Sequence, residues 1–339
     1  MTNKFYLGID IGGSKCVVVA GTETMEILEQ VRIPTETKQG PEYMINILLD
    51  HASKIFDKLK THTLVSIGIS CGGPLNSETG LIMSPPNLPG WDNIQITQFF
   101  TKRFGVPVFL HNDANACALA EWRFGAGKGT QNMIFLTFGT GLGAGMILNG
   151  KLYTGTNNMA GEIGHIRLAE DGPSGYGKQG SFEGFCSGGG IARLAQLVIS
   201  QKMSNGEDVG FLNNVKDKKK ITTEQLSNAA NAGDKTALEI FKISGKYLGV
   251  GISILIDILN PERIVIGSVF ARNPHLFEAI CKEVIEKEAL KPASEVCEIV
   301  PAALGDQLGD YASLCVAIPE NINQDFNLPI VNQNVSKKN

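Results

Sequence analysis

The stretch that decides the fold is Phe5-Tyr6-Leu7-Gly8-Ile9-Asp10-Ile11-Gly12-Gly13-Ser14-Lys15-Cys16-Val17-Val18-Val19. In it, two runs rich in apolar and β-branched residues flank a glycine turn, which is the pattern of a β-hairpin. A similar setting occurs further along the chain, where a strand expected from Asn132 to Phe138 runs into Gly139-Thr140-Gly141-Leu142-Gly143-Ala144-Gly145 and strand resumes at Met146. The two similar strand-turn-strand settings hint at duplicated domains.

The rest of the chain alternates between helical and strand patterns. Helices are expected over residues 41–60 and 114–124, and the chain reads as mostly helical from residue 188 until Arg263. Strands are expected over 65–70, 108–111 and 263–267, and the dipeptide Asn149-Gly150 is a strong hairpin signal. A chain of 339 residues is too long for one compact core, so the pattern predicts an α/β protein with two domains.

Composition and charge exclude several classes of protein. Hydrophobic residues make up 43% and charged residues 19%, as in ordinary globular domains. The net charge of −4 argues against a nucleic-acid partner, and the single basic run, Lys216 with Lys218 to Lys220, is expected to be a solvated loop. No basic leader and no apolar stretch of membrane-spanning length are present, so we expect a cytoplasmic protein without a membrane partner. Seven cysteines without a C-x-x-C pair predict reduced, mostly buried thiols.

The two glycine turns offer backbone N–H groups that can hold phosphate oxygens. The first, Asp10 to Lys15, adds a carboxylate suited to a hydrated Mg²⁺, and the second, Thr137 to Gly145, adds the hydroxyl of Thr140. Each turn alone is more simply explained as a hairpin, but two together favour phosphate binding. Nothing fits G-x-x-x-x-G-K-[ST], and although Gly139 to Ala144 fits G-x-G-x-x-A, the strand that follows argues against a dinucleotide fold.

A polar cluster at the end of a strand provides the candidate acceptor site. Asp113 lies where the strand 108–111 gives way to a helix, so it is either a helix cap or a base that takes a proton from a hydroxyl, and the local sequence favours neither. Asn112 beside it can bond a neighbouring hydroxyl. Glu162 and His165, with Glu183 downstream, form a second polar group that favours ligand contact. The segments Gly72-Gly73-Pro74 and Asn87-Leu88-Pro89-Gly90-Trp91 are expected either to form the opposite wall or simply to make turns.

Taken together, these motifs resemble the ROK family of sugar kinases and sugar-responsive repressors, within the actin-like ATPase superfamily, over nearly the whole chain to Ala317. The resemblance implies two ribonuclease H-like α/β domains with a ligand cleft between them. The first would span residues 1–113 and the larger second one 114–305. Ala303-Leu304-Gly305-Asp306 resembles the late family motif before a helix, about 306–318, that returns to the first domain. A polar tail, 319–339, would follow and is expected to be loosely ordered.

The resemblance also implies an activity and its site residues. The activity is phosphoryl transfer from MgATP to a hexose, with Asp113 as the catalytic base and glucose as the first choice of acceptor, giving glucose 6-phosphate. N-acetylglucosamine, N-acetylmannosamine, fructose and mannose remain alternatives, and a homodimer is a family expectation. The implied sugar-binding residues are Gly73, Asn87, Asn112, Asp113, Glu162, His165 and Glu183. The implied ATP-binding residues are Asp10, which also holds Mg²⁺ through water, Gly12, Gly13, Ser14, Lys15, Thr137, Gly139, Thr140, Gly141 and Gly267.

This chain departs from many family members in one motif. Many members bind structural zinc through C-x-C-G-x-x-G-C-x-E and the motif histidine, whereas the stretch here is Ser174-Gly175-Tyr176-Gly177-Lys178-Gln179-Gly180-Ser181-Phe182-Glu183. Serine and tyrosine cannot replace thiolates, so we expect no zinc site and expect local packing to position His165. Two alternatives to an enzyme are a sugar-sensing regulator of the same family and a sugar-binding protein without catalytic activity. The family's repressors carry an N-terminal helix-turn-helix, and a strand expected by Phe5 leaves no room for one.

Overall fold

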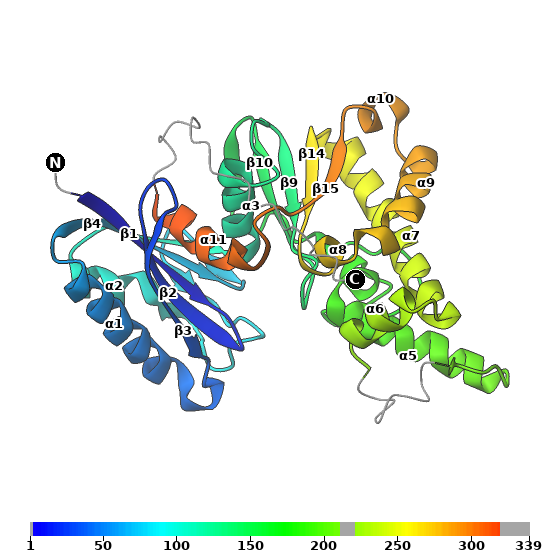
Figure 1. Ribbon diagram of the computed structural model, residues 1–339, viewed down its shortest axis with the longest axis horizontal. Helices are drawn as coiled ribbons and strands as arrows, with labels where there is room; N and C mark the ends of the chain where they lie inside the picture. The colour runs from blue at the N-terminus through cyan, green and yellow to red at the C-terminus, as the bar shows by residue number, and fades with distance from the viewer. Residues whose placement is uncertain (1–2, 211–220, 319–339) are drawn as a thin grey trace, which may run out of the picture.

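The computed structural model describes residues 3–210 and 221–318. The basic run at 216–220 and the polar tail from residue 319 lie outside the described residues. The described chain forms two lobes, with the N-terminal lobe built from the first third of the sequence (Figure 1). No helix within the described ranges is long and apolar enough to cross a membrane.

The N-terminal lobe is built on a five-stranded mixed sheet whose strands lie in the order β3-β2-β1-β4-β8. Strands β1, β2 and β3 form antiparallel neighbours, whereas β4 and β8 run parallel to β1. The bounds are β1 Asn3–Ile11, β2 Lys15–Gly21, β3 Ile27–Pro34, β4 His62–Cys71 and β8 Val108–Asn112. Helix α1 (Gly40–Lys58) follows β3 in the chain, and helix α2 (Ile96–Phe104) precedes β8. Between β4 and α2 the chain forms a small sheet of β5 (Leu75–Asn76), β6 (Leu81–Ile82) and β7 (Ile94–Gln95).

The C-terminal lobe repeats this topology strand for strand. Its sheet has the order β11-β10-β9-β14-β15, again with three antiparallel neighbours followed by two parallel strands. The bounds are β9 Met133–Leu136, β10 Ala144–Leu148, β11 Lys151–Tyr153, β14 Arg263–Ile266 and β15 Glu298–Pro301. The turn after β1 and the turn after β9 therefore occupy equivalent places in two copies of one fold, and the expected duplication and α/β class are confirmed.

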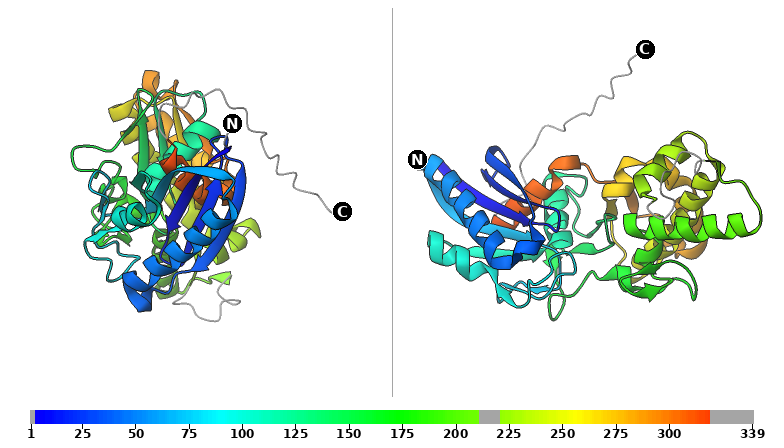
Figure 2. Two further views of the ribbon diagram at one scale, coloured as in Figure 1. Left: turned by 90° about the vertical axis from the view of Figure 1, so that its left-hand side faces the viewer. Right: turned by 90° about the horizontal axis from the view of Figure 1, so that it is seen from below.

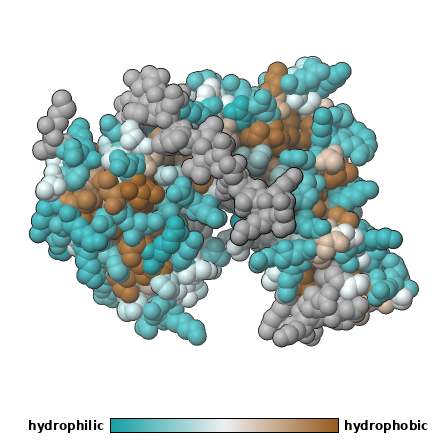
Figure 3. All heavy atoms as spheres, viewed as in Figure 1, coloured by the Kyte–Doolittle hydropathy of each residue, from teal (hydrophilic) through white to brown (hydrophobic). Residues whose placement is uncertain are grey.

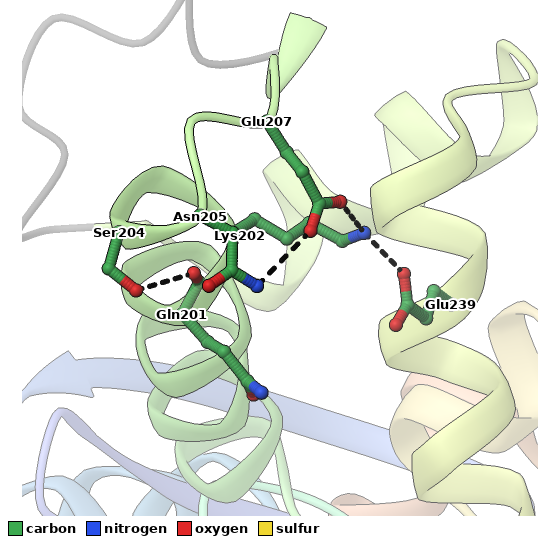
Figure 4. A network of polar contacts seen from close by, with 6 residues as sticks. All are labelled: Gln201, Lys202, Ser204, Asn205, Glu207 and Glu239. Atoms are coloured by element: carbon green, nitrogen blue, oxygen red, sulfur yellow. Dashed lines mark hydrogen bonds and ion pairs between the residues drawn. The ribbon is translucent and has the colours of Figure 1, made fainter.

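The helices of the C-terminal lobe cover its sheet and extend beyond it (Figures 1 and 2). They are α4 (Phe182–Phe185), α5 (Gly188–Ser204), α6 (Thr223–Asn231), α7 (Lys235–Leu259), α8 (Ser268–Arg272), α9 (Glu278–Glu288) and α10 (Lys291–Ser294), and a short hairpin, β12 (Ser174–Gly175) and β13 (Lys178–Gln179), precedes α4. Near the outer end of α5, Lys202 lies 3.0 Å from both Glu207 and Glu239, which links α5 to α7 (Figure 4). Exposed ion pairs of this kind add little stability, so the lobe depends on its apolar core.

Two helices lie between the lobes and join them. Helix α3 (Asp113–Phe124) packs against β9 and β10, while α11 (Leu308–Ala317) returns to β1 and β4 and also contacts α3. A shared hydrophobic cluster runs through this junction. The buried carboxylate of Glu121 on α3 accepts hydrogen bonds from the backbone N–H groups of Ala126, Ala303 and Leu304, which fixes the segment entering α11.

The visible surface is mainly hydrophilic, with hydrophobic side chains gathered over part of each lobe (Figure 3). All seven cysteines are free thiols, and five of them are buried, as the composition predicts: Cys16, Cys71, Cys186, Cys281 and Cys315.

Candidate active site

A cleft of about 790 Å³ brings together residues from both halves of the chain. Its N-terminal wall carries Gly73 and Asn87, and its C-terminal wall carries the segment 158–165 and part of the second glycine turn. The sequence-predicted residues found in its lining are Gly73, Asn87, Asn112, Asp113, Glu162, His165, Glu183, Thr137, Gly139, Thr140 and Gly141. Residues from distant parts of the sequence thus share one cavity.

Asp113 lies at the point where β8 ends and α3 begins. The N-cap of α3 is Asn112, whose Oδ1 accepts a hydrogen bond from the Ala114 N–H at 2.8 Å, while Asp113 occupies the first turn. The Asp113 side chain opens onto the cleft, yet the surrounding protein limits its hydration, and this desolvation raises its pKa to about 6. The negative charge of Glu162 acts in the same direction. Asp113 is therefore ionised at neutral pH but more basic than an ordinary aspartate.

The side-chain amide of Asn112 lines the cleft beside Asp113 and lies close to Gly73. The Nδ2 atom of Asn112 lies 3.0 Å from the position that a Cβ on Gly73 would occupy. A side chain at position 73 would therefore press on the Asn112 amide, and Gly73 itself lines the cleft. Trp91, from the second segment expected on this wall, is buried in the core of the N-terminal lobe instead.

Glu162 and His165 are presented by a short 3-10 helix, η2 (Ile163–His165), that follows a tight turn at Gly161. Gly161 has φ +93°, and a Cβ there would lie 2.0 Å from the carbonyl oxygen of Ala144. The Ala144 N–H donates to the Gly161 carbonyl at 2.8 Å. Strand β10 therefore fixes the segment that carries both polar side chains.

Glu183 connects the polar wall to the second glycine turn. Its Oε2 accepts a hydrogen bond from the Leu142 N–H at 3.1 Å and lies 2.7 Å from where a Cβ on Gly141 would be. Its other oxygen is left for the cleft, so Glu183 both supports the turn and lines the site.

The second glycine turn leaves donors available. Its shape is fixed by hydrogen bonds from the Gly139 N–H to the Gly141 carbonyl and from the Gly143 N–H to the Thr137 hydroxyl, both 3.0 Å. Within the described chain, the N–H groups of Thr140 and Gly141 donate to no protein acceptor, and both residues line the cleft. Such adjacent donors suit an anion.

The buried Phe138, which precedes this turn, has φ +40°, an unusual conformation for a bulky side chain. Strain of this kind commonly accompanies functional loops.

The first glycine turn lies beside the cleft rather than in its lining. Asp10, Gly12, Gly13, Ser14 and Lys15 do not line the cavity, but a Cβ on Gly13 would lie 2.6 Å from the carbonyl oxygen of Asn87, which does. Among residues 3–210 and 221–318, the N–H groups of Gly13 and Ser14 find no protein acceptor. The roles predicted for this turn stay predictions.

Asp10, at the end of β1, is electrostatically coupled to Asp113. Burial first, and the charge of Asp113 second, raise the pKa of Asp10 to about 7, although it shares a hydrogen bond with the Ser70 side chain. A divalent cation would offset both effects, so this carboxylate fits the predicted Mg²⁺ contact.

Gly267, the last residue predicted for nucleotide binding, lies outside the lining as well. It follows β14, and a Cβ there would lie 3.1 Å from the carbonyl oxygen of Thr137. Gly267 therefore borders the second glycine turn, because β14 runs parallel to β9 in the same sheet.

The cleft also contains side chains that sequence reasoning missed. Arg193, on α5, lies exposed in the lining near the backbone of Gly189, whose N–H donates to the Thr140 carbonyl at 3.3 Å. Tyr176 lines the opposite part near His165. An arginine on a helix and a tyrosine in a turn both read as ordinary surface residues, so no local signal marked them.

The stretch that departs from the zinc-binding motif makes other contacts here. The Ser181 hydroxyl caps α4 by accepting a hydrogen bond from the Gly184 N–H at 3.1 Å, and the Tyr176 ring lies against His165. In the described part of the chain, no group of three or more His, Cys, Asp or Glu residues is placed to hold a metal ion. The absence of zinc stays a prediction.

Comparison with known proteins places the chain among close relatives in sequence and structure. A sequence profile of the ROK family matches residues 6–316. The glucokinase of Halalkalibacterium halodurans is 32% identical over 317 residues, which cover 91% of this chain and 93% of that enzyme.

Among solved structures, a ROK family glucokinase from Streptomyces griseus in complex with glucose and AMPPNP superposes with a TM-score of 0.74 and 27% identity, covering 92% of this chain and 99% of that one. A ROK family transcriptional regulator, a homologue of the E. coli MLC protein, gives a TM-score of 0.81 and 26% identity, covering 93% of this chain and 78% of that one. Kinases and a regulator are thus both similar to this protein.

Proposed function

This chain belongs to the ROK family, and from that membership we propose that it is an ATP-dependent hexose kinase whose acceptor is glucose and whose product is glucose 6-phosphate. The observation that carries the proposal is the shared cleft. Its lining includes Asp113, the polar side chains of Glu162 and His165, and the free amides of the second glycine turn. A base beside a hydroxyl-binding wall and an anion-binding turn is the arrangement that phosphoryl transfer to an alcohol requires.

Asp113 acts as the general base. Its carboxylate takes the proton of the sugar hydroxyl as the hydroxyl oxygen bonds to the terminal phosphorus of ATP and the bond from that phosphorus to the bridging oxygen breaks, releasing ADP. The raised pKa of Asp113, about 6, supports this role, because the group is ionised at pH 7 and still basic enough to accept the proton. The proton then passes to solvent.

The nucleotide's phosphates lie against the two glycine turns. The N–H groups of Thr140 and Gly141 bind one part of the triphosphate, and those of Gly13 and Ser14 bind another, because all four point to no acceptor in the described protein. Mg²⁺, held through water by Asp10, would neutralise negative charge on the phosphates when bound. Closure of the lobes around both ligands excludes water, which would otherwise accept the phosphoryl group.

Glucose is proposed as acceptor because the wall offers several acceptors and donors for ring hydroxyls: the carboxylates of Glu162 and Glu183, the imidazole of His165 and the amide of Asn112. The similarity to a glucokinase over nearly the whole of both chains supports this choice. N-acetylglucosamine, N-acetylmannosamine, fructose and mannose are the alternatives among sugars. We also place the reaction in the cytoplasm, where ATP is available and thiols such as these stay reduced.

The second candidate function is a sugar-responsive regulator, which the similarity to a transcriptional regulator favours. A regulator and a kinase both bind sugar, but only the kinase consumes ATP in a sugar-dependent reaction. The test is a coupled ADP-release assay with MgATP across glucose, mannose, fructose and the two N-acetylated amino sugars. Release that depends on glucose and exceeds that with the other sugars is the expected result. Sugar binding by calorimetry without ADP release from any of them would refute the kinase assignment and favour the regulator.

A further inference from the structure

Tyr176 occupies a backbone position that does not suit it. The hairpin β12–β13 is closed by the two-residue turn Tyr176-Gly177, with φ +47° and φ +75°. A turn with two positive φ angles favours Asn-Gly, and a large side chain at its first position is strained.

The same chain contains the favoured solution at another hairpin. The turn Asn149-Gly150 joins β10 and β11 with nearly the same angles, φ +53° and φ +71°. The requirement of the turn therefore does not explain Tyr176. An unfavourable residue in such a place indicates a role for its side chain.

The ring of Tyr176 has a defined neighbour and a free face. Its centroid lies 4.8 Å from that of the His165 imidazole, with the planes at 71°, an edge-on contact of the kind aromatic rings prefer. The side chain is nevertheless 57% exposed and lines the cleft. One part of the ring thus contacts a predicted sugar-binding residue while the rest faces the cavity.

The hairpin is held firmly against the segment that carries His165. The Lys178 ammonium donates to the His165 carbonyl at 2.7 Å, and the Arg167 guanidinium donates to the Gln179 carbonyl at 2.8 Å. Both bonds come from β13, the strand that directly follows the turn, so this strand ties the turn to residues 165–167.

We propose that Tyr176 sets the affinity for the sugar: its ring holds the His165 imidazole edge-on, and its free face closes the sugar site against the apolar C–H face of a pyranose. The inference rests on the proposed function, in which this cleft binds a hexose. Tyr176 is a positioning residue and a wall of the binding site, and it takes no part in proton transfer. It therefore acts on sugar binding and leaves the ATP side of the cleft unchanged.

The test compares Tyr176→Asn, Tyr176→Gly and Tyr176→Phe with the reciprocal control Asn149→Tyr. Asn and Gly suit the turn and remove the ring, whereas Phe keeps it. The measurements are kcat, the KM values for glucose and ATP, the Kd for glucose by calorimetry without nucleotide, and Tm. The two ringless variants are expected to raise the KM and Kd for glucose about 3- to 10-fold with an unchanged KM for ATP and a Tm that is equal or higher. Tyr176→Phe is expected to stay within about twofold of the parent protein.

The control Asn149→Tyr places the same strain in a turn outside the cleft. It is expected to lower Tm and leave the KM for glucose unchanged. Unchanged sugar affinity in both ringless variants of an active enzyme would overturn the inference and leave the kinase assignment standing. A lower Tm in both ringless variants would overturn it too, because the ring would then support the fold. Absence of both sugar binding and ADP release in the parent protein would instead overturn the proposed function, and the inference with it.

Discussion

Asp113→Asn is the substitution that tests the chemistry most directly. The change keeps the size and shape of the side chain and removes its ability to accept a proton. Helix α3 should keep its N-terminal hydrogen bonds, because the Ala114 N–H donates to Oδ1 of both Asn112 and Asp113 at 2.8 Å and an asparagine at position 113 retains that oxygen. The variant also removes one of three neighbouring negative charges, since Asp113 acts on Asp10 and is acted on by Glu162.

The size of the expected effect follows from the role of the group. A positioned general base contributes about 10²- to 10⁴-fold to the rate, so kcat for glucose-dependent ADP release should fall by that factor. The Kd for glucose should change little, because an amide still bonds to a hydroxyl. Tm should be equal or higher, because limited hydration disfavours the charge that is removed and the pKa of Asp10 should fall toward its ordinary value.

The assay is ADP release coupled to a chromogenic reaction, with glucose binding measured separately by calorimetry. Glu42→Gln is the matched control, because Glu42 is an exposed acidic residue in the first turn of α1 and lies outside the cleft. It should leave kcat and both KM values unchanged. A kcat for Asp113→Asn within a few-fold of the parent value would refute the assignment of the base, and loss of sugar binding would show that Asp113 is needed for the site's structure instead.

Three further outcomes are expected. The value of kcat/KM should fall as the pH decreases below about 6, because Asp113 becomes protonated there, and a pH–rate profile without this fall would contradict the prediction. Over the same pH range the contribution of Asp113 to the free energy of unfolding should rise, because its pKa is higher in the folded protein than its ordinary value and the folded protein therefore binds the proton first. Arg193→Met should raise the KM for ATP and spare the KM for glucose, as steady-state kinetics would show, because the cation lies near the second glycine turn; equal effects on both substrates would place it elsewhere. Glu121→Gln should lower the free energy of unfolding by about 1–3 kcal/mol, measured by denaturant titration, because three backbone N–H donors lose the charged acceptor that the buried Glu121 provides; an unchanged midpoint would show that water replaces it.

The duplicated topology supports the proposal that two separate turns hold one nucleotide. The turn after β1 and the turn after β9 come from equivalent places in two sheets of identical strand order. Helices α3 and α11 lie between those sheets and pack on one another, so the two copies face each other across the junction. In the proposed mechanism, the second turn supplies phosphate donors from the lining of the cleft and the first turn supplies them from beside it.

The sequence by itself determined the features that depend on neighbours along the chain. Several local elements were predictable, because turn chemistry and side-chain periodicity act over a few residues. They are both glycine hairpins, the Asn149-Gly150 turn, the helix that begins at Asp113 and the short strand at 263–266. The local sequence also offered Asp113 as a cap or a base. The fold assigns the cap to Asn112, a difference of one residue that a pattern of polar residues does not resolve.

Only the tertiary structure decided which of these pieces meet. Four features of the site region join residues from separate elements. They are the contact of Glu183 with Leu142, the place of Arg193 beside the second turn, the ring of Tyr176 against His165 and the burial of Trp91. Such contacts follow from parallel strand pairing and helix packing, whose partners lie far apart in sequence and leave no local periodicity. The chemistry of the side chains was therefore visible in the sequence, whereas their convergence on one cavity required the packed fold.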